Sequence, residues 1–156
     1  MTQTLVRHEL KPEEGLLIVS CSKEKLVTDE PVPALELYQG ALVPYLRDHL
    51  DEVYHSRIRI LSARYGLLRP DDRIHPYDQK LRSRLEALAL QSLVTHRLTA
   101  DLRAPALRRV LVALDPLYLT AAICLFDHAP PLNLSVLSTT GDWSSASTKL
   151  TQWGWL

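Results

Sequence analysis

The chain has 156 residues, of which 46% are hydrophobic and 23% are charged, and its formal net charge is zero. This length suits one domain with a core of its own, and the composition excludes a disordered chain. No apolar run approaches the ~20 residues that a membrane helix needs, and the first ten residues lack the basic-then-apolar plan of a signal peptide.

Four apolar runs predict β-strands. The first, Gly15–Ser20, is apolar almost throughout, which is typical of a parallel strand that is buried on both faces. The other three are Arg57–Ser62, Arg108–Leu114 and Leu134–Ser138. Residues 1–14 precede the first strand and are expected to form a mobile N-terminal arm.

Helical spacing is found in four segments, at residues 34–50, 78–104, 116–128 and 144–156. The first contains Gly40 and Pro44, and the proline is expected to bend or divide the helix. Asp78 suits the N-cap position of the second, and Pro116 suits the first turn of the third. The second helix is expected to bury one side, formed by Leu81, Leu85, Leu88 and Val94. Trp153 and Trp155 in the last segment favour core packing over a binding platform.

Strands that alternate with helices predict an α/β fold. We expect residues 1–156 to form a single three-layer domain, with a mostly parallel sheet of about four strands flanked by helices. In such open sheets the ligand site lies beyond the carboxyl ends of the strands. Residues that follow the four strands here should therefore cluster at one edge of the sheet: Cys21, Ser62, Tyr65, Asp115 and Ser138.

The charges are unevenly distributed along the chain. Residues 57–109 contain 12 Lys or Arg but 5 Asp or Glu, whereas the rest of the chain contains 6 Lys or Arg and 13 Asp or Glu. This balance indicates either an anionic partner bound at one face or helix charges that are solvated and offset by acidic neighbours. On the first interpretation, Arg64, Arg69 and Arg82 lie on one positive face.

Two spaced motifs carry a family resemblance. Cys21–Lys25 (CSKEK) follows the first strand, and Ser62–Leu68 (SARYGLL) is followed by Pro76–Asp78 (PYD) and Leu81. Together with Leu37–Tyr38, these motifs resemble those of the YaaA-related peroxide-stress family. A similar Cys-Ser-Lys motif occurs in archaeosine synthase, a tRNA-modifying enzyme.

The resemblance implies a link to DNA binding and oxidative stress, and a fold similar to that of uracil-DNA glycosylases. It favours a cytoplasmic protein that acts on a nucleotide or nucleic acid (DNA or RNA), cleaving or exchanging a base-sugar bond in a DNA-damage or oxidative-stress response. The alternative is a non-catalytic DNA-binding stress-response protein. A deep pocket that joins the strand ends would favour the enzyme, and a broad positive surface would favour the binder.

Candidate catalytic residues follow the first and third predicted strands. Cys21, beside Lys23 and a turn with free backbone amides, is a candidate nucleophile, although a lone cysteine after a buried strand is often an apolar filler. Lys23, also a candidate catalytic residue, together with Ser22 and Lys25 suits the binding of an anion such as phosphate. Asp115 can act as a general base, but we favour it as the N-cap of the helix that Pro116 opens.

Candidate binding residues lie mainly in the long polar loop, residues 60–81. Tyr65 and Tyr77 can stack a base while Arg64 and Arg69 pair with phosphates; the alternative is that the tyrosines pack the loop and the arginines face water. The remaining candidates at the site are Tyr38, Ser62, Gly66, Ser138 and Thr139, with Gly66 expected to adopt a positive backbone angle. The histidines and the two cysteines show no metal-ligand spacing, so we expect no metal, no cofactor and no membrane partner.

Overall fold

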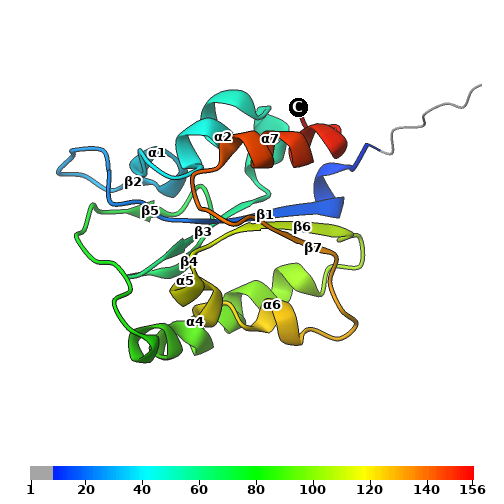
Figure 1. Ribbon diagram of the computed structural model, residues 1–156. Coiled ribbons are helices and arrows are strands. Elements are labelled where there is room, and N and C mark those ends of the chain that lie inside the picture. The colour runs from blue at the N-terminus through cyan, green and yellow to red at the C-terminus, as the bar shows by residue number, and fades with distance from the viewer. Residues whose placement is uncertain (1–8) are drawn as a thin grey trace, which may run out of the picture.

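A five-stranded sheet organises residues 9–156, the part of the chain that the computed structural model describes (Figure 1). Its strand order is β4-β3-β1-β6-β7. The strands are β1 (Gly15–Ser20), β3 (Ile58–Ser62), β4 (Gly66–Leu68), β6 (Arg109–Ala113) and β7 (Leu134–Val136). Four of them are parallel and β4 is antiparallel to β3. The predicted α/β fold with a mostly parallel sheet is confirmed.

The fifth strand, β4, was not predicted. It returns along β3 after a turn of three residues, with Ser62 opposite Gly66. Gly66 has a φ of +77°, as expected for the glycine of this turn. The Arg97 guanidinium of α4 donates to the carbonyl of Leu67 at 2.8 Å, on the edge of β4 that faces away from β3.

Helices cover both faces of the sheet (Figure 1). One face carries α1 (Ala34–Leu37), α2 (Val43–His49), α3 (Glu52–His55) and α7 (Trp143–Gln152). The other face carries α4 (Arg84–Leu102), α5 (Pro116–Ala121) and α6 (Cys124–Asp127). Alternate residues of β1 point into the two cores: Leu17 and Val19 into the first, Leu16 and Ile18 into the second. A small antiparallel pair, β2 (Val32–Pro33) and β5 (Arg73–Ile74), lies beside α1.

The long helix begins later than the sequence predicts. Its N-cap is Ser83, whose hydroxyl accepts from the Glu86 backbone at 3.2 Å, and not Asp78. Leu85 and Leu88 are 78% and 38% exposed, so their predicted burial is wrong, whereas Leu81 and Val94 are buried as predicted. Leu81 achieves its burial from the loop that precedes the helix.

Two other predicted helices are divided. Residues 34–50 form α1 and α2, separated by residues 38–42, and Pro44 lies in the first turn of α2 instead of at the break. Residues 116–128 form α5 and α6, with Ala122 and Ile123 between them. The predicted C-terminal helix is α7, which begins at Trp143 and ends at Gln152.

The two ends of the described chain lie together. The backbone N–H of Leu10 donates to the Trp153 carbonyl at 2.8 Å, and the Trp155 indole N–H donates to the Leu10 carbonyl at 2.9 Å. Trp153 and Trp155 are buried, which confirms that they pack in the core. Residues 1–8 of the predicted N-terminal arm lie outside the described residues, whereas residues 9–14 include the short 3₁₀ helix η1 (Pro12–Glu14).

The topology defines where a ligand site is expected. The chain leaves β1 for β3 on one side and later returns to β6 on the other side of β1. β1 and β6 are therefore the neighbouring strands at which the order reverses, and open α/β sheets bind ligands beyond the carboxyl ends of such strands. Within residues 9–156 no helix combines the length and apolarity needed to cross a bilayer.

Candidate functional site

A cavity of about 730 Å³ opens at the carboxyl ends of β1 and β6. Its volume falls in the range of ~300–1,000 Å³ that is usual for small-molecule sites. Its lining comes from Ser20–Lys25 after β1, Asp115 and Tyr118 after β6, the segment Asp78–Arg82, and the residues Ala41, Thr140 and Gly141. The cavity thus lies at the point of strand-order reversal.

Cys21 and Tyr118 meet inside this cavity. The Cys21 sulfur lies 3.8 Å from the Tyr118 hydroxyl, which also accepts the backbone N–H of Leu81 at 3.3 Å. Tyr118 is 7% exposed. Burial raises the pKa of the Tyr118 hydroxyl, so this hydroxyl remains protonated at neutral pH.

Sequence reasoning missed Tyr118. It stands three residues after Asp115 on α5, and side chains at this spacing lie on one face of a helix. Asp115 occupies the N-cap position of α5, but its side chain makes no capping hydrogen bond. The predicted position of Asp115 as the N-cap of α5 is therefore confirmed, although the carboxylate does not cap the backbone, and this exposed side chain lines the cavity.

Four cationic side chains line the cavity, namely Lys23, Lys25, Lys80 and Arg82. The acidic residues that line it are Glu24, Asp78 and Asp115, so the cations are in excess by one. None of the four cations forms an ion pair within 4.0 Å with another residue in the range 9–156. They are available for an anion, a group that such a cluster attracts and holds by charge-assisted hydrogen bonds.

Ser22 shapes the turn that presents Lys23. Its hydroxyl donates to the Glu24 carbonyl at 2.7 Å and accepts the Gly40 backbone N–H at 3.1 Å. A Cβ at Gly40 would lie 2.9 Å from that of Ser22, so only glycine fits there. The next residue, Ala41, has a φ of +57°, a strained angle for a side chain with a Cβ, and it lines the cavity.

A chain of three hydroxyls supports the polar loop. The Tyr77 hydroxyl lies 2.6 Å from both the Ser62 and the Tyr38 hydroxyls. Ser62 also accepts the backbone N–H groups of Arg64 and Tyr65, at 3.2 and 3.1 Å. Burial raises the pKa values of Tyr38 and Tyr77, so these hydroxyls also stay protonated.

The aromatic rings of the loop pack on one another. Tyr77 meets Tyr65 and Tyr38 edge to face, with centroids 5.4 and 6.3 Å apart, and the Lys25 ammonium lies 4.4 Å from the Tyr77 centroid. Arg64 lies over the Tyr65 ring at 5.7 Å. Of these five residues, Lys25 alone lines the cavity. This packing matches the structural alternative for the tyrosines.

With the exception of Arg69, the predicted site residues fall into three groups. Those that line the cavity are Cys21, Ser22, Lys23, Lys25 and Asp115. Those that stand behind it, in the packed loop, are Tyr38, Ser62, Arg64, Tyr65, Gly66 and Tyr77. Ser138 and Thr139 are exposed beyond β7 and do not line it, although the next two residues, Thr140 and Gly141, do.

Arg69 lies elsewhere. It lines a separate cavity of about 520 Å³ together with Arg59, Arg97 and Asp101. Arg59 is 2% exposed, and its guanidinium donates to both carboxylate oxygens of Asp101, at 2.9 and 3.0 Å. The Arg69 guanidinium lies 3.8 Å from the same carboxylate.

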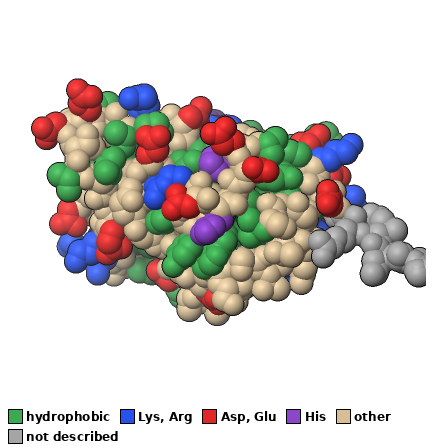
Figure 2. Space-filling view, turned by 90° about the horizontal axis from the view of Figure 1, so that it is seen from above, with side chains coloured by type: hydrophobic (Ala, Val, Ile, Leu, Met, Phe, Trp, Pro, Cys, Tyr) green, Lys and Arg blue, Asp and Glu red, His purple; other side chains and the backbone are tan. Residues whose placement is uncertain are grey.

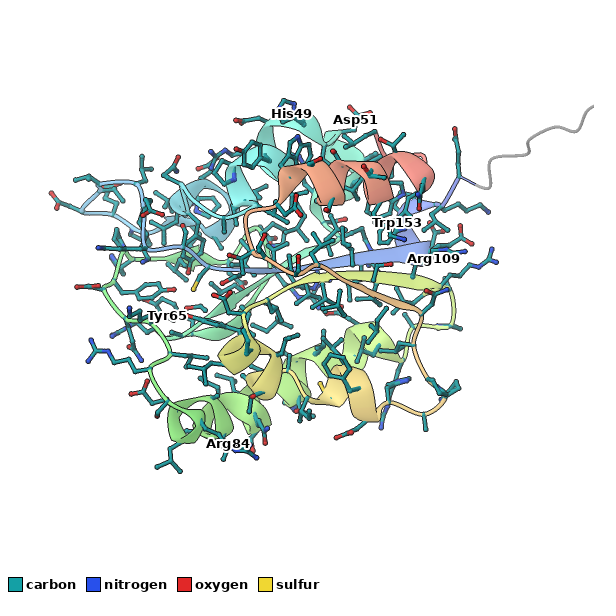
Figure 3. The ribbon with its side chains drawn as sticks, in the orientation of Figure 1. His49, Asp51, Tyr65, Arg84, Arg109 and Trp153 are labelled. Atoms are coloured by element: carbon teal, nitrogen blue, oxygen red, sulfur yellow. The ribbon has the colours of Figure 1, made fainter. Side chains whose placement is uncertain are left out.

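The basic segment does not form one face. Figure 3 shows Arg109 at the opposite end of the sheet from Tyr65, and Arg84 on α4 below it. Arg108 pairs with Glu14 at 3.6 Å, far from the cavity that Arg82 lines. Figure 2, which views the layer of α2 and α7 from above, shows acidic and basic side chains interspersed with hydrophobic ones. Within the basic segment, Arg59, Arg97 and Arg108 each lie within 4.0 Å of an acidic side chain, so acidic neighbours offset part of its charge.

No three His, Cys, Asp or Glu side chains gather as metal ligands within the described part of the chain.

A family model described as "Family of unknown function (DUF6884)" matches residues 16–125. Two UPF0246 proteins of Lactobacillus delbrueckii subsp. bulgaricus, from different strains, are 40% and 39% identical to the chain over 72 residues. That match covers 43% of the chain and 29% of each relative, so the similarity to the UPF0246 (YaaA) family is distant and partial. The extent of the family match shows that the chain belongs to the DUF6884 family.

Proposed function

We propose that the chain binds a nucleotide, free or within a nucleic acid, in the cavity at the ends of β1 and β6. The observation that carries this proposal is a group of four cations, Lys23, Lys25, Lys80 and Arg82, around a cavity of ligand size; none of them is ion-paired within residues 9–156. Phosphate is the anion that such a cluster suits, and the position at the strand-order reversal supports a ligand site.

The same cavity holds the groups needed to cleave or exchange a base-sugar bond. In this scheme the Cys21 thiolate attacks the sugar carbon, the carbon–nitrogen bond breaks, and its electron pair leaves with the base, which takes a proton from water and leaves a hydroxide. A second water then attacks the same carbon, the electron pair of the carbon–sulfur bond returns to sulfur, and Asp115 accepts a proton of that water. The hydroxide takes this proton from Asp115, which restores the carboxylate. Both side chains line the cavity.

The geometry gives less support to a binder that uses a broad positive surface. Arginines of the basic segment lie at both ends of the sheet, and Arg59 is buried in an ion pair. A protein that binds DNA only through the phosphate backbone of the DNA is expected to carry its arginines and lysines on one face. We therefore favour a ligand that enters the cavity with one nucleotide unit.

Calorimetric titration with a panel of nucleosides and nucleotides tests the proposal. We expect nucleotides to bind and the matching nucleosides to bind at least tenfold more weakly, because a charge-assisted contact contributes ~1.5–3 kcal/mol and ~1.4 kcal/mol is a factor of ten. Lys23→Ala should weaken nucleotide binding by about tenfold or more. Arg109→Ala, at the other end of the sheet, is the matched control and should leave the affinity unchanged.

Catalysis is tested separately with bound nucleotides. Release of free base, followed by chromatography, should depend on Cys21 and Asp115 and should be lost in Cys21→Ser and in Asp115→Asn. If nucleotides bind but no base is released, the nucleotide site is supported and the proposed reaction is wrong. Equal affinity for nucleosides and nucleotides, or equal effects of the Lys23 and Arg109 substitutions, would show that the cavity is not a phosphate-binding nucleotide site.

A further inference from the structure

The Tyr118 hydroxyl has one proton, and its surroundings determine where that proton can go. The backbone N–H of Leu81 donates to the hydroxyl oxygen at 3.3 Å, so this contact does not use the proton. The other hydrogen-bond neighbour of the hydroxyl within the described residues is the Cys21 sulfur, at 3.8 Å. Two states of this pair matter, one with Cys21 as the thiol and one with Cys21 as the thiolate, and the direction of the hydrogen bond differs between them.

In the thiol state, the Cys21 S–H donates to the Tyr118 oxygen, and this is a weak bond between neutral groups. In the thiolate state, the Tyr118 O–H donates to the negatively charged sulfur. Hydrogen bonds with an ionised partner are about twice as strong as those between neutral groups. Tyr118 thus favours the thiolate over the thiol, and burial, which raises the pKa of Tyr118, keeps its proton available.

The hydroxyl chain behind the cavity holds one proton more than its own contacts use. Ser62, Tyr77 and Tyr38 carry three hydroxyl protons, but the two contacts between them use only two. One hydroxyl proton is therefore left over within this group of three hydroxyls. Burial raises the pKa values of Tyr38 and Tyr77, so their protons stay on the hydroxyls at neutral pH.

We propose that Tyr118 is a positioning residue that holds the Cys21 sulfur in the cavity and stabilises it as the thiolate. This deepens the proposed function, on which it rests for the identity of the substrate. The consequence for the chain alone is a reactive Cys21 near neutral pH, because the thiolate and not the thiol is the nucleophile.

Alkylation by iodoacetamide, a neutral reagent, measures this reactivity without any nucleotide. The background is Cys124→Ala, which removes the only other cysteine. Tyr118→Phe should slow alkylation of Cys21 by about fivefold or more near pH 7, and by less than about twofold near pH 9.5, where most thiols ionise without help. Tyr54→Phe is the control, since Tyr54 stacks on Trp155 in the other core, and it should change neither rate.

The effect of Tyr118→Phe on the alkylation rate, compared between the two pH values, distinguishes stabilisation of the thiolate from a structural role. A structural role for the Tyr118 hydroxyl would loosen the cavity and raise the alkylation rate, or change it equally at both pH values. Either result, or an unchanged rate, overturns the proposal. A second measurement uses the protein with Tyr118 intact: the ultraviolet absorbance of a thiolate should be present near pH 7 and absent in Cys21→Ser, and its absence from both proteins also overturns the proposal.

The two proposals fail independently. If nucleotide binding depends on Lys23 but the alkylation rate of Cys21 does not depend on Tyr118, the nucleotide site is supported and this inference is wrong. If the alkylation rate depends on Tyr118 but no nucleotide binds, Cys21 is activated as proposed and its substrate is not a nucleotide.

Discussion

Replacing Asp101 by asparagine should destabilise the protein more than any surface substitution. Arg59 is 2% exposed on β3, and its partner Asp101 on α4 is 8% exposed. Two hydrogen bonds, at 2.9 and 3.0 Å, join the guanidinium to the carboxylate. Asparagine keeps the shape of the side chain but removes the negative charge, and Arg59 is then left buried without a counter-ion.

The expected cost follows from this burial. Breaking a buried ion pair by removing one partner typically costs ~3–5 kcal/mol, because the remaining charge cannot return to water. For a chain of this size, each kcal/mol lowers the melting temperature by roughly 2–4 °C, so the expected fall is on the order of 6–20 °C. Urea unfolding followed by circular dichroism gives the free energy, and a thermal scan gives the melting temperature.

Asp48→Asn is the matched control, because Asp48 is 64% exposed and pairs with Arg47 at 3.5 Å on the surface. Exposed pairs contribute ~0–1 kcal/mol, so this variant should unfold almost like the parent. A loss below about 1 kcal/mol for Asp101→Asn would refute the reasoning, since it would mean that water reaches Arg59 once its partner is gone.

Three further predictions test the cavity and the backbone. An anionic methanethiosulfonate should modify Cys21 at least about threefold faster than a cationic one, with a smaller difference at high salt; equal rates would show that the lysines do not control access. Gly66→Ala should cost ~1–3 kcal/mol in urea unfolding, because φ is +77° and a Cβ would lie 2.8 Å from the Leu93 side chain, whereas Gly141→Ala, with open space around it, should cost less than half as much. Gly15→Ala places a Cβ 2.6 Å from the Trp155 ring and should shift the tryptophan fluorescence; an unchanged spectrum and stability would contradict this packing.

The parallel strands were predictable because burial on both faces leaves a continuous apolar run. Gly15–Ser20 was predicted as it is found, and the third strand was predicted with one extra residue at each end. β4 was missed because a strand of three residues after a glycine turn carries too short a pattern. The start of α4 was placed at Asp78 because Leu81 fits the helical period, although Ser83 and Glu86 form the Ser-x-x-Glu pattern of a capping box.

The site was predictable as far as the strand ends define it. Cys21, Lys23 and Asp115 line the cavity because each follows a parallel strand. Tyr118 was not predicted, since its partnership with Cys21 joins positions 97 residues apart and leaves no local pattern. Arg69 was assigned to the same site on its charge alone, and the antiparallel course of β4 carries it to a different cavity.

The edge strand β4 also bears on how the protein associates with copies of itself. A free sheet edge is a template on which another chain can add a strand, which is a common route to aggregation. Here the carbonyl of Leu67, which faces away from β3, already accepts a hydrogen bond from Arg97, and the strand is only three residues long. A positively charged guanidinium at this edge repels an identical edge that approaches it. The same arginine that helps to fix α4 against the sheet therefore also opposes the pairing of this edge with another molecule.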